Sequence, residues 1–295
     1  DRLMELENRT PDETVNYTIE HPLKEFAWLV VGAVGTVALI TTLIGLFAGE
    51  LAARLPYRYE KAVAVEVSAT LMADRPGDNP QASRDVEREL NRLGARLAAD
   101  MQLPEGMAIT VHYQDTPMVN AFATLGANIV ICRGLLEQLA DENALAMVLA
   151  HEIAHAKLRH PARSLGRGVA VGIILSAIHA SMGSSAASGA INTAGNASLL
   201  KFSRDQEREA DFAALAVLSG IYGHVGGAQD VFHLLERANG EHTTLRVPML
   251  STHPLSQERI ESIAVLAGER GWRPDGPRVP LPDALEGLRR TPAAG

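Results

Sequence analysis

The chain has 295 residues, of which 46% are hydrophobic and 21% charged, and its net charge at pH 7 is -8. A chain of this length and composition can bury one core of about 200 residues, which excludes an intrinsically disordered protein. The acidic balance and the lack of a basic stripe argue against a nucleic-acid partner. The single cysteine, Cys132, excludes an intramolecular disulfide and any multi-cysteine zinc site. We interpret Cys132 as a small buried hydrophobic residue, so any metal must be held by histidine and carboxylate.

Residues 1–25 are polar and acidic, and we expect an exposed leader there. Residues 26–49 carry no charged side chain, and a helix of that length, at about 1.5 Å per residue, crosses a hydrocarbon core of about 30 Å. We therefore predict one transmembrane helix. A signal peptide is the alternative, but its apolar core is usually only about 7 to 15 residues long. Arg54, Arg58 and Lys61 follow the helix, so the positive-inside rule favours, by a small margin, a cytoplasmic domain.

The next segments predict a small sheet and one helix. Residues 61–72 alternate between apolar and polar side chains, which is typical of a strand. Pro80 suits the first position of a helix. The apolar stripe of that helix consists of Val86, Leu90, Leu93 and Leu97. Residues 107–113 predict a second strand, and residues 119–131, broken around Gly126, predict a hairpin or bent strand pair.

The helix predicted over residues 141–159 carries the pattern H-E-x-x-H at His151, Glu152 and His155. Its apolar residues recur at helical spacing, and Asp141 suits the N-cap. Because the two histidines are four residues apart, their imidazoles project from the same side and can bind one zinc ion. A metal in such a site lowers the pKa of its bound water towards about 7, and an adjacent carboxylate can take the proton. A histidine pair in a satisfied core would show the same short pattern.

Residues 165–202 combine an apolar helix with a small-residue loop. The stretch 168–182 is short for a membrane span and contains His179, so it predicts a buried or membrane-skimming helix. Residues 183–199 are rich in Gly, Ala and Ser and predict a mobile loop that is a candidate cover for the active site. His160 suits a surface or capping position. The other histidines outside the motifs have no partner at metal spacing: His112, His179, His224, His233 and His242.

The stretch from Ser203 to Gly220 predicts a helix with two carboxylates, Glu207 and Asp211, one turn apart. It begins with a capping box formed by Ser203 and Gln206, and Gly220 is expected to end it. A catalytic zinc needs a third protein ligand, which Glu207 can supply, and Asp211 can accept the free ring N–H of a ligand histidine. The alternative is a charged helix face that pairs with neighbouring arginines.

Five short motifs follow one another along the chain. They are N-A-F-A (120–123), R-G-L-L (133–136), H-E-I-A-H (151–155), E-R-E-A-D (207–211) and T-H-P (252–254). In this order they resemble the HtpX and CAAX prenyl endopeptidase family of membrane-associated zinc metalloproteases, with its Oma-type and BepA-type members. The resemblance covers about residues 59–268, and several ordered motifs are far more specific than H-E-x-x-H alone.

The resemblance implies a mostly helical α+β fold of the zincin-like, gluzincin type, with a small sheet beside the H-E-x-x-H helix and the Glu207 helix crossing behind the metal. It implies one Zn2+ per chain, and the implied ligands are His151, His155 and Glu207. Glu152 is then the general base, and Asp211 supports a ligand histidine.

The histidine of the T-H-P motif maps to His253, and the resemblance implies that it polarises the scissile carbonyl or stabilises the oxyanion. A preorganised donor of this kind can be worth about 3 to 4 kcal/mol. The alternative role for His253 is that of an N-cap before Pro254. The resemblance also implies a substrate-binding edge strand, which pairs with an extended peptide through its backbone. That strand consists of Asn120, Ala121, Phe122 and Ala123.

We therefore expect a membrane-anchored zinc endopeptidase that hydrolyses peptide bonds with a metal-activated water, in protein quality control. Its domain is expected to span residues 59–270, and the Pro- and Gly-rich residues 271–295 to form a tail that wraps it. The expected partners are protein or peptide substrates and the lipid bilayer, and the expected location is a bacterial inner membrane, crossed once. The sequence leaves the oligomeric state open.

Two other functions compete with this one. The first is a non-proteolytic, chaperone-like or plugged protein that uses its zinc site structurally. Glu152 and His253 argue against it, because a structural zinc site needs neither. The second is prenyl-peptide processing, which the single N-terminal span makes doubtful.

Overall fold

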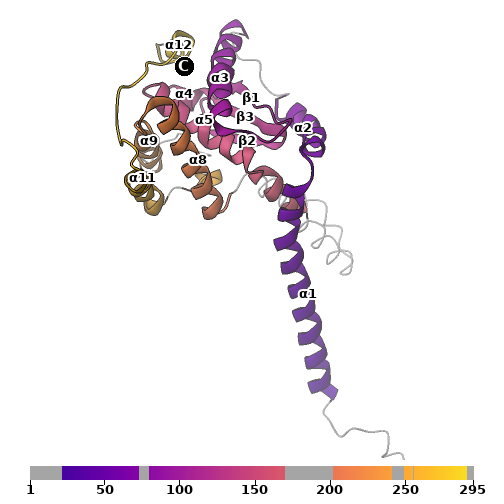
Figure 1. The fold of residues 1–295 in the computed structure, drawn as a ribbon. Coiled ribbons are helices and arrows are strands. Elements are labelled where there is room, and N and C mark those ends of the chain that lie inside the picture. Colours follow the sequence, from indigo (N-terminus) through magenta and orange to yellow (C-terminus); the bar gives the residue numbers. More distant parts are fainter. Residues whose placement is uncertain (1–21, 73–79, 170–201, 241–248, 255, 291–295) are drawn as a thin grey trace, which may run out of the picture. The chain divides into compact units, whose positions relative to one another are not determined.

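The computed structural model describes residues 22–72, 80–169, 202–240, 249–254 and 256–290. The chain divides into two units, Asp1–Leu43 and Ile44–Gly295. Figure 1 shows the elements of each in chain order. The predicted leader (1–25), the predicted apolar helix (168–182) and the predicted loop (183–199) lie wholly or mostly outside the described residues.

Helix α1 (Pro22–Arg54) contains the residues predicted to cross a membrane. Its most apolar window has a mean hydropathy of 2.3, and none of that window is buried. Among the described residues, α1 is the one helix that is long and apolar enough to cross a bilayer. Its exposed apolar side chains favour a membrane span over the core helix of a soluble protein.

The predicted strand over residues 61–72 is wrong, because these residues belong to helix α2 (Tyr57–Met72). One face of α2 contacts the turn at Gly126. The Tyr57 hydroxyl donates to the Gly126 carbonyl at 2.7 Å, and the Glu60 carboxylate accepts from the Gly126 N–H at 2.9 Å. Tyr57 and Glu60 are three residues apart and share a helix face, whereas the short alternation of valines in this segment imitates a strand.

Three strands form one small mixed sheet in the order β1-β3-β2. Their bounds are Thr110–Gln114 for β1, Ala121–Thr124 for β2 and Asn128–Cys132 for β3. β1 is parallel to β3, and β2 is antiparallel to β3, so the predicted strand pair is confirmed. The 3-10 turn η2 (Leu125–Ala127) joins β2 to β3, and Gly126 within it has φ +73°. β2 is therefore an edge strand of this sheet.

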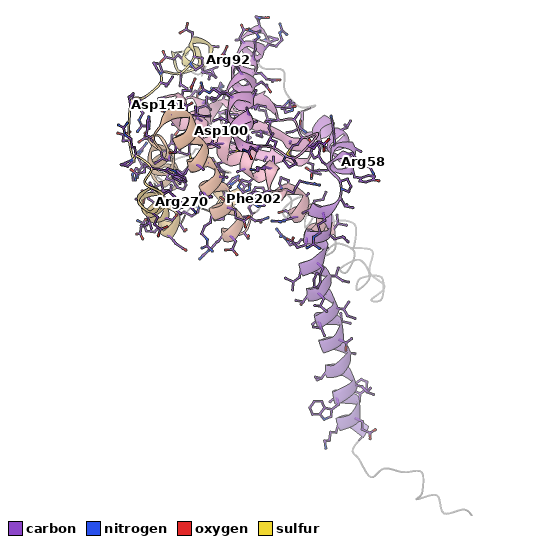
Figure 2. All side chains as sticks on the ribbon, in the orientation of Figure 1. Arg58, Arg92, Asp100, Asp141, Phe202 and Arg270 are labelled. Carbon is purple, nitrogen blue, oxygen red and sulfur yellow. The ribbon has the colours of Figure 1, made fainter. Side chains whose placement is uncertain are left out.

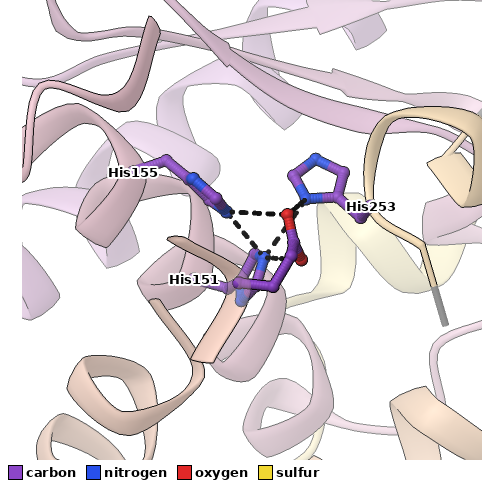
Figure 3. Close-up of side chains that lie close together, drawn as sticks. His151, His155 and His253 are labelled. Carbon is purple, nitrogen blue, oxygen red and sulfur yellow. Dashed lines mark hydrogen bonds and ion pairs between the residues drawn. The ribbon is translucent and has the colours of Figure 1, made fainter. Parts of the chain in front are cut away.

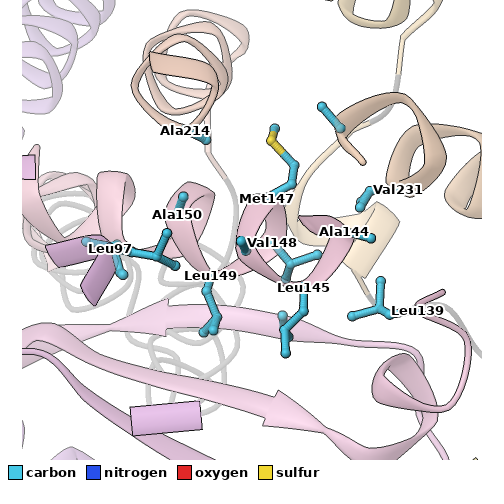
Figure 4. Close-up of a cluster of buried hydrophobic side chains, with 14 of the residues drawn as sticks. Leu97, Leu139, Ala144, Leu145, Met147, Val148, Leu149, Ala150, Ala214 and Val231 are labelled. Atoms are coloured by element: carbon cyan, nitrogen blue, oxygen red, sulfur yellow. The ribbon is translucent and has the colours of Figure 1, made fainter. Parts of the chain in front are cut away.

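Helix α5 (Glu142–Lys157) lies at the centre of the core. It packs against the sheet, α3 (Pro80–Met101), α8 (Arg204–Tyr222) and α9 (Ala228–Gly240). Every residue of α5 up to Ala156 is buried. In Figure 4 its Leu145 and Leu149 extend towards the strands. The stripe predicted for α3 is buried as well, which confirms that helix. The fold is mostly helical with a small mixed sheet, as predicted.

The remaining helices lie towards the C-terminus. They are α4 (Arg133–Leu136), α9 (Ala228–Gly240), α10 (Met249–Thr252), α11 (Gln257–Arg270) and α12 (Asp283–Arg290). Between α11 and α12 the chain caps the start of α5: Glu142 N–H donates to the Val279 carbonyl at 2.8 Å, and Val279 N–H donates to Asn143 Oδ1 at 2.9 Å. Charged side chains such as Arg92 of α3 and Arg270 of α11 lie at the surface (Figure 2).

Candidate active site

Helix α5 places the H-E-x-x-H residues inside the core. Asp141 is its N-cap, as predicted, and its carboxylate accepts from the Ala144 N–H at 2.8 Å. His151 is 5% exposed, and Glu152 and His155 are fully buried. The two imidazole rings lie on the same side of the helix with their centroids 4.6 Å apart. Buried polar side chains of this kind require partners, and the neighbouring helices supply them.

Helix α8 brings the two predicted carboxylates to the same place. The predicted capping box is confirmed: the Ser203 hydroxyl accepts from the Gln206 N–H, and the Gln206 side chain accepts from the Ser203 N–H. This cap sets the start of the helix. One turn later, Glu207 and Asp211 are both 1% exposed and face α5.

The end of α8 differs from the prediction. The helix does not stop at Gly220 but continues to Tyr222, and Gly223 forms its C-cap with φ +73°. A glycine ends a helix when it adopts the left-handed conformation at the C-cap, and here the later glycine does so.

The imidazoles of α5 and the carboxylate of Glu207 belong to one buried cluster, of which Figure 3 labels the histidines. His151 Nε2 and His155 Nε2 are 3.0 Å apart. Glu207 Oε2 lies 3.4 Å from His151 Nε2, and Glu207 Oε1 lies 3.5 Å from His155 Nε2. With His253, these residues offer four ligand atoms that all lie within 4.8 Å of one another. Such a set could hold one metal ion.

His253 follows α10 and is only 2% exposed. Its Nδ1 lies 3.1 Å from Glu207 Oε1 and 3.3 Å from His151 Nε2, and its Nε2 lies 3.5 Å from Glu152 Oε1. Ser256 is the N-cap of α11, so the N-cap alternative for His253 is wrong. The structure thus makes His253 a fourth candidate ligand, a role that the sequence did not suggest.

Buried polar atoms without partners test whether a metal fits this cluster. Neither carboxylate oxygen of Glu152 has a hydrogen-bond partner among the described residues, and neither has His253 Nε2. A carboxylate in this position is costly unless an ion or ordered water pairs with it. Imidazole nitrogens with one carboxylate are also a usual donor set for zinc. The residues present therefore fit a zinc ion and a water beside it.

Arg259 is a residue of this site that the sequence reasoning missed. It is 7% exposed and binds Asp211 with two hydrogen bonds, Nε to Oδ2 at 2.8 Å and Nη2 to Oδ1 at 2.9 Å. Its Nη1 lies 2.8 Å from Glu207 Oε2. Asp211 Oδ1 in turn lies 2.9 Å from His151 Nδ1. Arg259 therefore neutralises and orients both carboxylates, and Asp211 orients His151.

A signal for Arg259 was present in the sequence. The buried residues of α11 are Arg259, Ile263 and Ala267, which recur every four residues. Arg259 thus falls on the apolar stripe of its helix, where a charged side chain must have a buried partner.

His160 was predicted at a surface or capping position, and the structure contradicts this. It is fully buried; its Nδ1 lies 2.9 Å from His155 Nδ1, and its Nε2 lies 3.1 Å from Glu209 Oε2. Phe202, labelled in Figure 2, stacks on His155 with the two ring centroids 4.0 Å apart. Packing of distant segments buries His160, and no local pattern marks it.

The ionisable residues of the cluster differ in the direction in which their pKa values are shifted. Burial lowers the pKa of His151, but hydrogen bonds to the carboxylates of Asp211 and Glu207 outweigh it and raise that pKa to about 10. Burial raises the pKa of Glu207, yet His253 and His151 hold it well below its usual range. Burial and the neighbouring His151 keep the pKa of His155 well below its usual value. Perturbations of this size are typical of functional sites.

The strand predicted to bind substrate lies next to this cluster. β2 contacts both α5 and α10. Ala121 and Ala123 are buried, whereas Phe122 is partly exposed. Asn120, just before the strand, is 7% exposed, and its Oδ1 has no hydrogen-bond partner in the part of the chain that the structure describes. The edge strand thus runs beside the helix that carries the candidate ligands.

A buried H-E-x-x-H helix, a carboxylate from a later helix and an edge strand beside them define the zincin-like class of metallopeptidase domains. Comparison with family models narrows this class. The model of peptidase family M48 matches residues 84–267, and the chain belongs to that family.

Several relatives carry named activities. The chain is 31% identical over 161 residues to the mitochondrial metalloendopeptidase OMA1 of Schizosaccharomyces pombe. This match covers 52% of this chain and 45% of that protein. It is 31% identical over 183 residues to a putative beta-barrel assembly-enhancing protease of Vibrio cholerae, covering 58% of this chain and 37% of that protein. The human mitochondrial metalloendopeptidase OMA1 is 26% identical to this chain over 167 residues. This match covers 51% of this chain and 31% of that protein. These matches span less than half the length of each relative.

Proposed function

We propose that this chain is a zinc-dependent endopeptidase of gluzincin type that binds one Zn2+. The observation that carries the proposal is the buried set of His151, His155 and Glu207. Beside it lies Glu152, whose carboxylate oxygens have no hydrogen-bond partner among the described residues. Bound zinc supplies a Lewis acid that polarises a carbonyl and lowers the pKa of water. Membership of family M48 and the metalloendopeptidase relatives support the same reaction class.

Within this proposal each residue has a separate task. Glu152 takes a proton from the attacking water and returns it to the leaving amine. Asp211 holds His151 so that its Nε2 faces the other ligands, and Arg259 holds Asp211. The peptide bond to be cleaved would lie between Glu152 and the groups that polarise its carbonyl, which are the bound zinc and His253.

The substrate is proposed to be an extended peptide that pairs with β2. Backbone pairing with an edge strand reads extension more than side-chain identity, which suits a protease that cleaves misfolded or membrane-associated proteins in quality control. Of the predicted residues 120–123, Ala121, Phe122 and Ala123 belong to β2, which contacts α5.

Measurement of zinc content by mass spectrometry, together with casein cleavage, tests the assignment. Wild type is expected to hold about one zinc per chain and to cleave casein. Glu152→Gln should keep the zinc and lose cleavage, whereas Glu207→Ala should lose both. Asp205→Ala, an exposed carboxylate on the same helix as Glu207, is the matched control and should retain both. Full activity in Glu152→Gln would refute the assigned base, and no zinc in wild type would refute the metal site.

A plugged site is the second candidate function, and the position of His253 favours it. If His253 stabilises the oxyanion, as we expect, His253→Ala should lower the rate of cleavage by about 100- to 1000-fold. If His253 instead occupies the ligand position that water needs, the same variant should cleave faster than wild type. Measurement of the zinc content of the same variant distinguishes the loss of a metal ligand from the loss of a hydrogen-bond donor to the oxyanion.

Attachment to a membrane through α1, which crosses it once, is proposed from the apolarity of α1. The cytoplasmic side is proposed for the domain because Arg54, Arg58 and Lys61 follow the apolar stretch, although the margin is small. The full chain is expected to remain in the pellet on alkaline extraction of bacterial inner membranes. Val37→Arg with Ile40→Arg should release it, because each arginine at a helix centre costs about 2.5 to 3.5 kcal/mol. Val65→Arg in α2, an exposed apolar position outside the span, is the control and should stay bound.

A further inference from the structure

His155 differs from His151 in the partner that holds its ring. His151 Nδ1 contacts the carboxylate of Asp211 directly, at 2.9 Å. His155 Nδ1 instead contacts a second imidazole, that of His160, at 2.9 Å, and His160 Nε2 contacts Glu209 Oε2 at 3.1 Å. Three side chains from three helical segments thus form one chain of contacts that starts at a candidate ligand.

The backbone is bent to bring His160 to this place. Arg159, the residue before it, has φ +60°, a left-handed conformation that is unfavourable for a residue with a side chain. Contacts hold it there: Arg159 Nε lies 2.5 Å from Glu60 Oε2, and its Nη1 donates to the Leu55 carbonyl at 3.0 Å. The turn lets His160 fold back under His155. Backbone strain of this kind is concentrated at functional sites.

One assignment of protons satisfies every contact in the chain. A ligand imidazole that offers its Nε2 lone pair to a metal carries its proton on Nδ1. His155 Nδ1–H then donates to His160 Nδ1, so His160 carries its own proton on Nε2 and donates it to the Glu209 carboxylate.

We propose that His160 and Glu209 are positioning residues of the metal site, which fix the tautomer and the ring orientation of His155 through a carboxylate–imidazole–imidazole chain. The inference rests on the proposed zinc site. Phe202 stacks on the His155 ring but offers no acceptor, so His160 is the acceptor that the described residues provide for Nδ1. Glu209 is half exposed and lines an open cavity with Lys157 and Phe212, so the chain leads from the buried cluster to the surface.

Zinc affinity, measured by competition with a chromophoric chelator, tests the proposal together with kcat/KM on a peptide substrate. His160→Leu removes the acceptor at similar volume and should weaken zinc binding by about 10- to 100-fold, as the loss of such partners usually does. His160→Asn places an oxygen near the former Nδ1 and should recover most of that loss. A merely structural histidine would lower the thermal stability of both variants alike and leave their zinc affinities equal.

Glu209 provides a second test, because its side chain is half exposed. Glu209→Ala should weaken zinc binding, and Glu209→Gln, which still accepts the hydrogen bond, should weaken it less. His233→Leu and Glu236→Ala disrupt an exposed histidine–carboxylate pair elsewhere and should change nothing.

Zinc affinity equal to wild type in both His160→Leu and Glu209→Ala would overturn the inference. If His160→Leu does not fold, unchanged affinity in Glu209→Ala overturns it alone. Wild-type protein without zinc would instead overturn the proposed function itself, so the two failures are distinguishable.

Discussion

Arg259 is the one arginine within contact of both Glu207 and Asp211 among the residues that the structure describes. Both carboxylates are almost fully buried, and Arg259 is the permanently charged group that contacts each of them. Removal of one partner from a buried ion pair costs far more than the pair contributes when intact. Arg259 therefore links the stability of the fold to the geometry of the candidate site.

The substitution Arg259→Met should destabilise the protein by about 3 to 5 kcal/mol, because two buried carboxylates lose their cation. Arg259→Lys should recover only part of this loss, since an ammonium group cannot make the two parallel hydrogen bonds to Asp211. Arg208→Ala is the control, an exposed arginine paired with Asp205 and Glu258, and should cost no more than about 1 kcal/mol. Urea unfolding measures all three, and equal effects of Arg259→Met and Arg208→Ala would contradict the assignment.

Cys132 behaves as predicted from its apolar surroundings, for it is fully buried in β3. Burial raises the pKa of its thiol to about 12. The thiolate is the reactive form, and its share falls tenfold for each pH unit below that pKa. The native protein should therefore resist alkylation by iodoacetamide at pH 8 and react fully in denaturant, as mass spectrometry would show. Fast labelling of the native protein would contradict this burial.

At the scale of elements, the turn between β2 and β3 depends on the approach of α2. Gly126 has φ +73°, and a Cβ there would lie 2.5 Å from the Ala64 Cβ. Gly223, the C-cap of α8, has the same φ but nothing within 4 Å of its would-be Cβ. A comparison of substitutions at these two glycines therefore separates the effect of backbone conformation on stability from the effect of packing.

Alanine at Gly223 should cost about 1 to 2 kcal/mol for the left-handed backbone alone. Alanine at Gly126 should cost about 1 to 3 kcal/mol more, because α2 must also move away from the turn. Thermal unfolding of the two variants side by side measures the difference. Equal losses of stability would show that α2 does not pack on this turn.

At the scale of the whole molecule, metal binding to this site is expected to stabilise the folded chain. Its candidate ligands come from three segments that are distant in sequence, α5, α8 and the residue after α10. A ligand that binds only the folded chain stabilises it by mass action, by about 4 kcal/mol at a concentration about 1,000 times its dissociation constant.

Removal of metal with a chelator should therefore lower the melting temperature of wild type, and added zinc should restore it. Glu207→Ala should show no response to either treatment, because it lacks a ligand. A melting temperature of wild type that is insensitive to chelator and to zinc would contradict the coupling.

Local patterns in the sequence were enough for much of this protein. Helical spacing and capping residues located α3, α5 and α8, and the ordered motifs pointed to the family that the comparison confirms. These features depend on neighbours within a few residues, so they can be read from the chain directly. The H-E-x-x-H spacing likewise put both histidines on one face of one helix.

Tertiary structure alone decided the rest. α2 forms a helix where valine alternation indicated a strand, because its Tyr57 and Glu60 bind a turn far along the chain. Arg259 and His160 reach the site only after distant segments pack, as does the close approach of His253 to Glu207. The physical reason is that a buried charge or imidazole takes its partner from whichever element covers it, and short-range patterns carry no record of that contact.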